Sequence, residues 1–266
     1  MGTNIFHKTM AGTALAIVFS LVVRGQHYPD YPSLSKYSHW SVMLGGSLYS
    51  PATLNLTEGT YVFKNKPLTS GNIGIEYDFF VDRKWSVVTG VHATWEPAVN
   101  MEIFVKREDY STNHESIDIV FPFKQNATYS LSIPLLGGYN WQLNERVFLS
   151  FYGGGRMRFL PSGIISSGYL VRFEELNESR EVFAMRLETP EQVYSGGLIA
   201  GSGVSYDLDK FLLKCNVLYV MNFQNTVEGE YLFDNVYETP RSRGEYALSG
   251  NHLSLQFLIS FKQNEK

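Results

Sequence analysis

The chain has 266 residues, of which 15% are aromatic and 18% are charged, and its formal net charge is -4. This length suits a single domain, and a composition rich in aromatic and poor in charged residues favours a β-rich or lipid-facing protein. The slight acidity gives no basic surface for nucleic acid, so we expect no nucleic-acid partner. Cys215 is the only cysteine, which excludes an intrachain disulfide framework and a cysteine cluster that binds zinc or iron–sulfur.

The start of the chain has the pattern of an export signal. A short apolar run over 14–23 follows His7 and Lys8, and Gly25 supplies a small residue at the expected cleavage point. A run of about ten residues is too short for a transmembrane helix, which needs roughly 20. We therefore predict a cleaved signal peptide over 1–25, with an ordinary buried segment as the alternative. No later stretch has the pattern of a transmembrane helix, so a membrane crossing would require strands.

From Trp40 onward, apolar residues alternate with polar or small ones, a period of two that indicates β-strands with one apolar face. Eight segments show this alternation: 40–48, 72–79, 85–95, 129–141, 147–159, 194–206, 211–222 and 252–261. Three connections are tight polar turns: 81–84, 142–146 and 207–210. The connections between them are several times longer: 50–71, 96–128, 160–193 and 224–250. This rhythm predicts an all-β fold, an eight-stranded antiparallel up-and-down transmembrane β-barrel with long extracellular loops and short periplasmic turns.

Two features indicate that the apolar face is the outside of this barrel. The other face carries many glycines and serines but few lysines or glutamates, which suits a crowded lumen better than a water-exposed exterior. Aromatic residues also gather at the strand ends, where membrane interfaces favour them. The predicted interface aromatics are Trp40, Phe79, Trp85, Trp95, Tyr129, Trp141, Tyr194, Tyr206, Phe211 and Phe261. The alternative is a soluble barrel in which they are large core residues.

The second face also carries nine polar residues that we predict to form a network inside the lumen, because an unpaired buried charge is costly. They are Glu76, Asp78, His92, Arg156, Arg158, Lys214, Asn216, His252 and Gln256. A narrow conducting or substrate path is an alternative. Catalysis is another, since His92 and Glu96 share a face, but no nucleophile elbow accompanies them. We therefore expect no catalytic residue, no cofactor and no metal site.

The long loops contain alternating pieces of their own, which suggest strands that continue beyond the bilayer: 101–106, 116–123, 169–174 and 181–187. We expect the loops over 96–128, 160–193 and 224–250 to meet other outer-membrane or periplasmic proteins, or else only to shield the rim. The expected organisation assigns 26–38 to a short, extended periplasmic segment, 39–262 to the barrel and 263–266 to a tail.

Two segments and the last alternating strand resemble the outer-membrane β-barrel domains of Bacteroidetes, the PorT-like and OmpX-like group. The segments are 133–139 (IPLLGGY) and 197–206 (GLIAGSGVSY). The resemblance covers about residues 38–262 and its motifs are structural. It implies a small closed barrel, residence in the outer membrane and frequently no assigned activity. Because the sequence stops at Lys266, we expect no peptidoglycan-binding domain of the OmpA-like kind.

Together these observations predict a non-enzymatic outer-membrane barrel, surrounded by outer-membrane lipid, that acts as a structural or interaction component. An accessory subunit of an outer-membrane export or assembly complex is the more specific form of this expectation. The alternatives are a small pore for ions or small solutes and a lipid-modifying barrel enzyme.

Overall fold

The computed structural model describes residues 30–59, 64–105, 119–173, 178–191, 193–234 and 241–263. These residues form 14 β-strands and one short 3-10 helix, and the strand pairs are antiparallel. Among them, no helix has the length and apolar character needed to cross a membrane. The predicted signal peptide lies outside the described residues.

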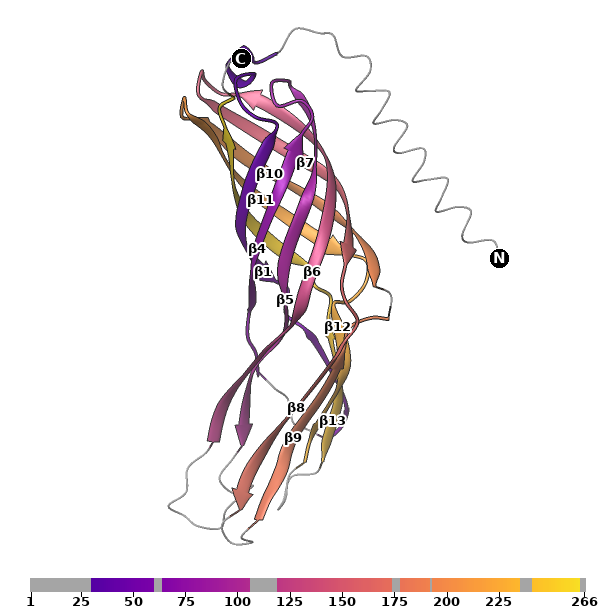
Figure 1. The fold of residues 1–266 in the computed structure, drawn as a ribbon. Coiled ribbons are helices and arrows are strands. Elements are labelled where there is room, and N and C mark those ends of the chain that lie inside the picture. The colour runs from indigo at the N-terminus through magenta and orange to yellow at the C-terminus, as the bar shows by residue number, and fades with distance from the viewer. Residues whose placement is uncertain are drawn as a thin grey trace, which may run out of the picture.

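Eight strands close into a ring in the order β5-β4-β1-β14-β11-β10-β7-β6, and pairing of β6 with β5 completes it (Figure 1). They are β1 (Trp40–Tyr49), β4 (Leu68–Asp78), β5 (Trp85–Val105), β6 (Ile119–Gln142), β7 (Val147–Phe159), β10 (Tyr194–Asp207), β11 (Phe211–Asn222) and β14 (His252–Phe261). Each of the eight predicted segments overlaps one of these strands. The prediction of an all-β, antiparallel architecture is therefore confirmed.

Three short turns join the strands at one end of the ring, which we call the turn end: 79–84, 143–146 and 208–210. An Asp or Asn side chain fixes each turn by accepting backbone N–H groups, the usual role of these residues in turns. Asp78 accepts from Phe80 at 3.1 Å, and Asp207 accepts from Asp209 at 2.9 Å. Asn144 accepts from the N–H groups of residues 146 and 147, both at 2.9 Å.

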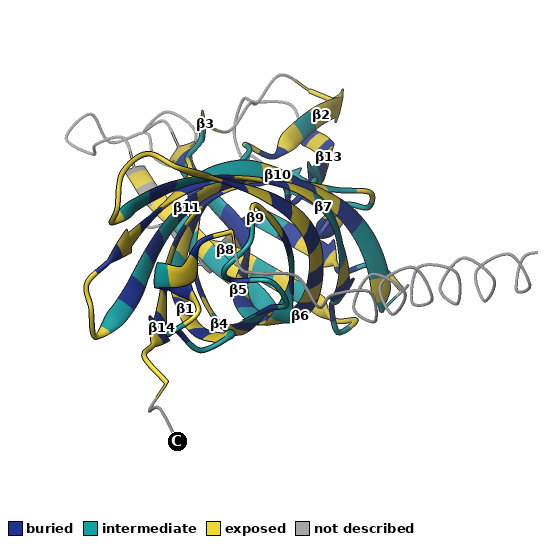
Figure 2. Ribbon diagram, turned by 90° about the horizontal axis from the view of Figure 1, so that it is seen from above, coloured by how far each residue is buried: buried dark blue, intermediate teal, exposed yellow. Residues whose placement is uncertain are grey.

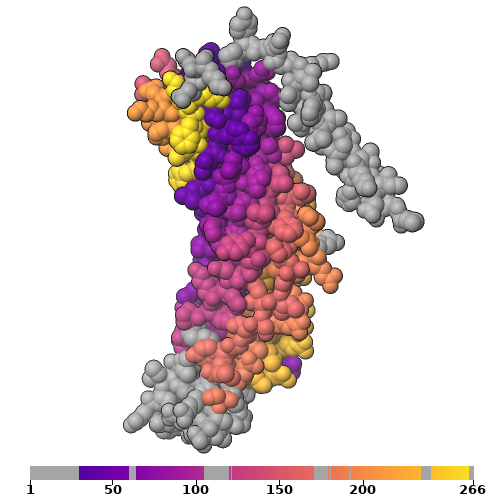
Figure 3. Space-filling view, in the orientation of Figure 1, coloured from indigo at the N-terminus to yellow at the C-terminus, as the bar shows by residue number. Residues whose placement is uncertain are grey.

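Six further strands extend from the opposite end of the barrel. They are β2 (Thr53–Glu58), β3 (Lys64–Asn65), β8 (Ile164–Phe173), β9 (Glu178–Glu188), β12 (Val227–Phe233) and β13 (Ser242–Leu248). Among them, β8 and β9 overlap the alternating pieces predicted at 169–174 and 181–187, whereas β2, β3, β12 and β13 were assigned to loops. Five of them form a separate sheet in the order β2-β13-β12-β9-β8, and β3 pairs with β5. β5 and β6 continue past the barrel as a hairpin, paired as far as Val105 and Ile119. We call the separate sheet and this hairpin the head, which prolongs the barrel into an elongated body (Figure 3).

The head has an apolar core of its own. Phe183 and Leu187 of β9 join Met101 and Ile103 of β5 in one cluster of fully buried side chains. The ring of Phe123 on β6 meets that of Phe183 edge-on, with centroids 5.4 Å apart. Burying a large apolar side chain contributes about 1.5–3 kcal/mol. The head is therefore a packed structure held by contacts between its sheet and its hairpin.

Residues 31–37 close the turn end of the barrel, so the expectation of an extended segment here is wrong. Pro32–Leu34 form the 3-10 helix η1. Its neighbourhood buries three side chains against the barrel, Tyr31, Leu34 and Tyr37. They pack against Val81, Phe148 and Leu212. The aromatic and apolar residues of this segment thus fill the mouth of the barrel, a role that their sequence did not reveal.

Burial alternates residue by residue along the barrel strands, as the stripes in Figure 2 show. On β14, for example, Ser254 and Gln256 are buried whereas Leu255 and Phe257 are exposed. Most large apolar side chains of the barrel strands therefore point outward, and most polar or small ones point inward. A soluble barrel has the reverse arrangement, because it hides its apolar face from water.

Candidate functional site

The outside of the barrel carries a band of exposed apolar side chains with aromatic residues at both of its ends. Trp85 pairs with Tyr139 near the turn end, with ring centroids 4.9 Å apart, and Trp95 pairs with Tyr129 near the head at 5.5 Å. The two tryptophans lie ten residues apart on β5. At about 3.3 Å per residue and a strand tilt of about 40°, this spacing spans about 25 Å along the barrel axis, the height of the apolar band of outer-membrane barrels.

The structure exposes eight of the ten predicted interface aromatics: Trp40, Trp85, Trp95, Tyr129, Trp141, Tyr194, Tyr206 and Phe261. Phe79 and Phe211 are half-buried. At the turn end, Tyr77 adds a residue that we did not predict, and its ring lies 4.9 Å from those of both Trp40 and Phe79. The aromatic residues thus form contacts across neighbouring strands at the margins of the band.

The predicted lumen residues lie on the inward-facing side of the strands. Eight are buried: Glu76, Asp78, His92, Arg158, Lys214, Asn216, His252 and Gln256. Arg156 is half-buried as a whole residue. Lys214 Nζ lies 3.3 Å from Asp78 Oδ2. His92 Nε2 lies 3.0 Å from Glu76 Oε1, although this approach lacks hydrogen-bond geometry.

Glu96 is the centre of a second network in the lumen; the sequence placed it on the face of His92, but we did not include it among the predicted network residues. Its carboxylate accepts hydrogen bonds from Tyr49 Oη at 3.0 Å and from Ser130 Oγ at 2.5 Å. Arg158 Nη1 lies 3.8 Å from Glu96 Oε1 and donates to Thr226 Oγ1 at 2.9 Å. Both charged residues are 1% exposed.

Apolar side chains fill another part of the lumen. The cluster consists of Val88, Leu136, Tyr152, Ile199, Leu218 and Val220. The sequence already indicated part of this cluster, because three apolar residues, Val88, Leu136 and Leu218, fall on the face that is otherwise polar or small. Eight strands leave an interior just wide enough for side chains to fill, and this cluster together with the two polar networks makes the interior of this barrel a packed one.

His92, which we considered for catalysis, and His252 both have neighbours in the lumen that account for their positions. His252 Nδ1 lies 2.9 Å from Gly250 O, and its ring centroid lies 4.6 Å from that of Tyr49. His92 faces Glu76. In the part of the chain that the structure describes, no group of three or more His, Cys, Asp or Glu side chains could hold a metal ion. The absence of catalysis and cofactors stays a prediction.

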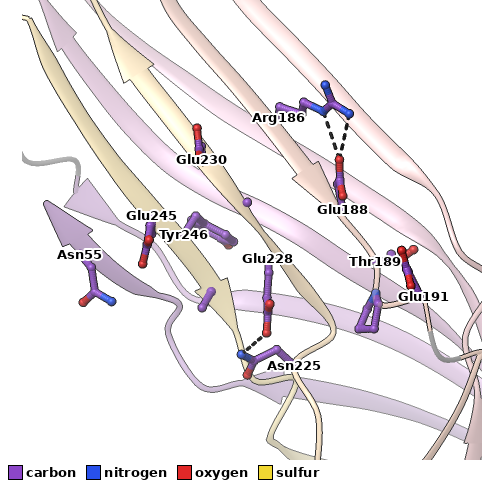
Figure 4. Close-up of a pocket in the computed structure, with 13 residues that line it drawn as sticks. Asn55, Arg186, Glu188, Thr189, Glu191, Asn225, Glu228, Glu230, Glu245 and Tyr246 are labelled. Carbon is purple, nitrogen blue, oxygen red and sulfur yellow. Dashed lines mark hydrogen bonds and ion pairs between the residues drawn. The ribbon is translucent and has the colours of Figure 1, made fainter. Parts of the chain in front are cut away.

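A groove of about 780 Å³ hollows the outer face of the head sheet (Figure 4). Five carboxylates from β9, β12, β13 and the segment after β9 line it: Glu188, Glu191, Glu228, Glu230 and Glu245. Arg186 is the only basic residue among the described lining residues, and its Nη2 lies 3.0 Å from Glu188 Oε1. We missed this groove because β12 and β13 were assigned to loops, although Glu228 and Glu230 already show the spacing of a strand.

Comparisons with known proteins give matches to solved structures alone, since no protein-family model and no curated protein matches the chain. Outer membrane protein OprG from Pseudomonas aeruginosa is similar with a TM-score of 0.42 and 13% identity, over 85% of this chain and 98% of that one. A major outer membrane protein from Thermus thermophilus gives 0.38 and 12%, over 84% and 98%. Outer Membrane Protein W from E. coli gives 0.32 and 13%, over 85% and 98%. At TM-scores below 0.5 these overlays are loose and carry no inference about function.

Proposed function

We propose that this chain is a non-enzymatic β-barrel of a bacterial outer membrane that carries a folded head for contact with other proteins. The observation that supports it most is the inverted burial of the barrel. Leu44 and Trp85 are 64% and 70% exposed on the outside, whereas Glu76 and Lys214 are buried inside. Monomeric soluble proteins rarely expose apolar patches larger than a few hundred Å². Exposing an apolar surface to water costs free energy, and a bilayer removes this cost because the surface contacts hydrocarbon instead. The closed ring also leaves no strand edge unpaired in the membrane.

In this proposal the turn end faces the periplasm and the head lies outside the cell. Outer-membrane barrels place short turns in the periplasm and longer connections outside. The first barrel strand begins at the turn end and the last one ends there, where Tyr37 and Lys262 form an isolated β-bridge. Export through the predicted signal peptide over 1–25 would deliver the chain to the periplasm, from which the barrel inserts.

The packed lumen supports a structural role rather than the alternative of a small pore. Pairing of Lys214 with Asp78 and of Arg158 with Glu96 joins strands that are not neighbours in the ring. Such contacts brace the barrel from within, and the apolar cluster around Leu136 fills space that a conducting path would need.

In its more specific form, the proposal makes the chain an accessory subunit of an outer-membrane export or assembly complex. The contact region would be the part of the head that comes from the long connections over 96–128, 160–193 and 224–250. A packed head that prolongs the barrel offers a rigid surface at a distance from the membrane, which suits protein contact better than shielding of the rim. The PorT-like or OmpX-like subtype stays a prediction.

Co-purification from native membranes in mild detergent tests this proposal. We expect the chain to fractionate with the outer membrane and to elute with a stable partner. A triple variant of the groove, Glu228→Gln, Glu230→Gln and Glu245→Gln, tests whether the partner contacts the head sheet. Glu102→Gln is the matched control. Glu102 lies on the hairpin, where its carboxylate pairs with Lys66, and it is not part of the groove lining.

Two outcomes would count against the proposal, at different levels. Recovery of the chain only as a free monomer would contradict the accessory-subunit role. Recovery in the soluble fraction without detergent would contradict the membrane barrel itself.

A further inference from the structure

A small cavity of about 20 Å³ lies inside the barrel. Its lining includes polar residues from several strands, among them Asn72 of β4, His92 of β5, Arg156 of β7 and Gln256 of β14. A cavity needs roughly 10–15 Å³ of this kind of volume to hold one water molecule. The space therefore fits a ligand of one non-hydrogen atom.

Asn72, Gln256, Arg156 and His92 each carry a buried atom with no hydrogen bond in the protein: Asn72 Oδ1, Gln256 Oε1, Arg156 Nε and His92 Nε2. His92 Nε2 also lies 3.0 Å from Glu76 Oε1, but without hydrogen-bond geometry. Although Arg156 is half-buried as a residue, its Nε is enclosed, and its Nη2 donates to Asn222 Oδ1 at 2.6 Å. Buried polar groups in native proteins are nearly always hydrogen-bonded. That four such atoms belong to residues lining one cavity points to a shared ligand.

The hydrogen-bonding capacity of these atoms selects the kind of ligand. Both amide oxygens only accept, Arg156 Nε–H only donates, and His92 Nε2 does either according to its protonation. An anion would face the two amide oxygens, and a cation would face the guanidinium of Arg156. A water molecule donates two hydrogen bonds and accepts two, so it alone matches this mixture of donors and acceptors.

The position of the four residues gives such a water a structural role. Around the ring, β7 stands three strands away from β4 and three strands away from β14. Arg156 therefore lies across the lumen from Asn72 and Gln256, and a shared ligand would join walls that the backbone ladder does not. The cavity is also lined by Leu136, Ile199 and Leu218. The four polar residues therefore lie next to the apolar cluster of the lumen.

We propose that one ordered water molecule is a fixed part of the lumen, held by Asn72, Arg156, Gln256 and His92 as a bridge between opposite walls of the barrel. This proposal does not depend on what the outside of the barrel contacts.

A crystal structure of the detergent-purified protein, at a resolution that shows ordered water, tests the proposal. We expect one spherical peak within hydrogen-bond distance of at least three of the four atoms. A cavity without density, or side chains that turn and bond directly to one another, would overturn it. A second crystal grown with bromide in place of chloride distinguishes an anion, because an anomalous peak at this point would also overturn the water.

Two variants test whether these residues hold the water. Gln256→Met removes one acceptor at nearly constant volume and should weaken or displace the peak. Asn216→Leu is the matched control, since Asn216 is also buried with an unbonded Oδ1 but does not line the cavity. An unchanged peak in the first variant, or a lost peak in the second, would contradict the assignment, and circular dichroism verifies that both variants fold.

Discussion

Two adjacent glycines on β7 show how differently the two faces of the barrel wall are packed. A Cβ atom on Gly154 would lie 2.2 Å from Leu135 O and 2.9 Å from Leu136 Cα, both backbone atoms that cannot move independently. A Cβ atom on Gly153 would meet nothing within 4 Å. The inward position therefore requires glycine, whereas the outward position has room for a side chain.

Replacing these two glycines should separate the two faces experimentally. Gly154→Ala should lower the free energy of unfolding by about 1–3 kcal/mol, the usual effect of overpacking. Gly153→Ala should change it by less than about 1 kcal/mol, because the methyl group enters open space. Unfolding by urea in detergent micelles measures both values. Equal losses in the two variants would contradict the packed lumen.

The cap formed by residues 31–37 offers a second matched pair of residues. Tyr37 Oη donates to the carboxylate of Asp207, whose other oxygen lies 3.0 Å from Lys36 Nζ. Tyr31 Oη donates to the uncharged carbonyl Asn140 O at 2.9 Å. Burial, reinforced by the hydrogen bond to Asp207, raises the pKa of Tyr37 above its ordinary value, so the phenol remains a donor at neutral pH.

The Tyr37→Phe variant should lose more stability than the Tyr31→Phe variant. Hydrogen bonds to charged groups contribute about 1.5–3 kcal/mol, compared with about 0.5–1.5 kcal/mol for neutral ones. Thermal unfolding in detergent at neutral pH compares the two variants with the unsubstituted protein. A larger loss for Tyr31→Phe would show that the Asp207 contact is not a principal anchor of the cap.

At the scale of elements, the sequence predicted the barrel strands and pieces of the hairpin, of β8 and of β9, but missed β2, β3, β12 and β13 of the head. Each barrel strand carries a long alternating pattern, and 10 to 24 residues give that pattern room to show. β12 and β13 have only seven residues each, and β12 pairs with the equally unrecognised β13 and with β9. Their pairing depends on contacts that are distant in sequence, which local alternation does not encode.

The same limit applies to the candidate sites. Alternation placed the nine lumen residues on one face but did not predict which of them pair. Whether His92 faces Glu76 or Asp78, and which of the two Lys214 faces, depends on strand register and tilt. The groove on the head sheet needed three strands to be assembled before its carboxylates came together. The turn over 142–146 was predicted, whereas the residues of the cap were assigned to an extended periplasmic segment.

The head should behave as an element with its own core. Phe183→Ala removes a fully buried ring from that core and should cost about 3–5 kcal/mol, which opens the head to proteolysis while the barrel stays resistant. Leu170→Ala is the control on the neighbouring strand, because Leu170 is 64% exposed. Limited proteolysis with mass spectrometry maps the cuts. Equal resistance of both variants would contradict an independent core in the head.

At the scale of the whole molecule, we expect two environments, hydrocarbon around the barrel and water around the head. Leu135 on the barrel and Leu170 on the head are both exposed. Leu135→Arg should destabilise the protein in lipid vesicles by about 2–4 kcal/mol if it lies near the middle of the bilayer. Leu170→Arg should have an effect within about 0.5 kcal/mol, as surface substitutions in water usually do. Similar values for both would mean that the two leucines share one environment.

The four tryptophans of the chain allow the most direct test of lipid contact without any substitution. Trp40, Trp85 and Trp141 lie towards the turn end and Trp95 towards the head, and all four are exposed on the outside of the barrel. Membrane interfaces are where tryptophan side chains of such barrels gather. In vesicles, phospholipids brominated near the headgroup should quench their fluorescence more strongly than phospholipids brominated at the chain ends, and aqueous iodide should quench it weakly. Strong quenching by iodide with none by either brominated lipid would contradict the membrane barrel.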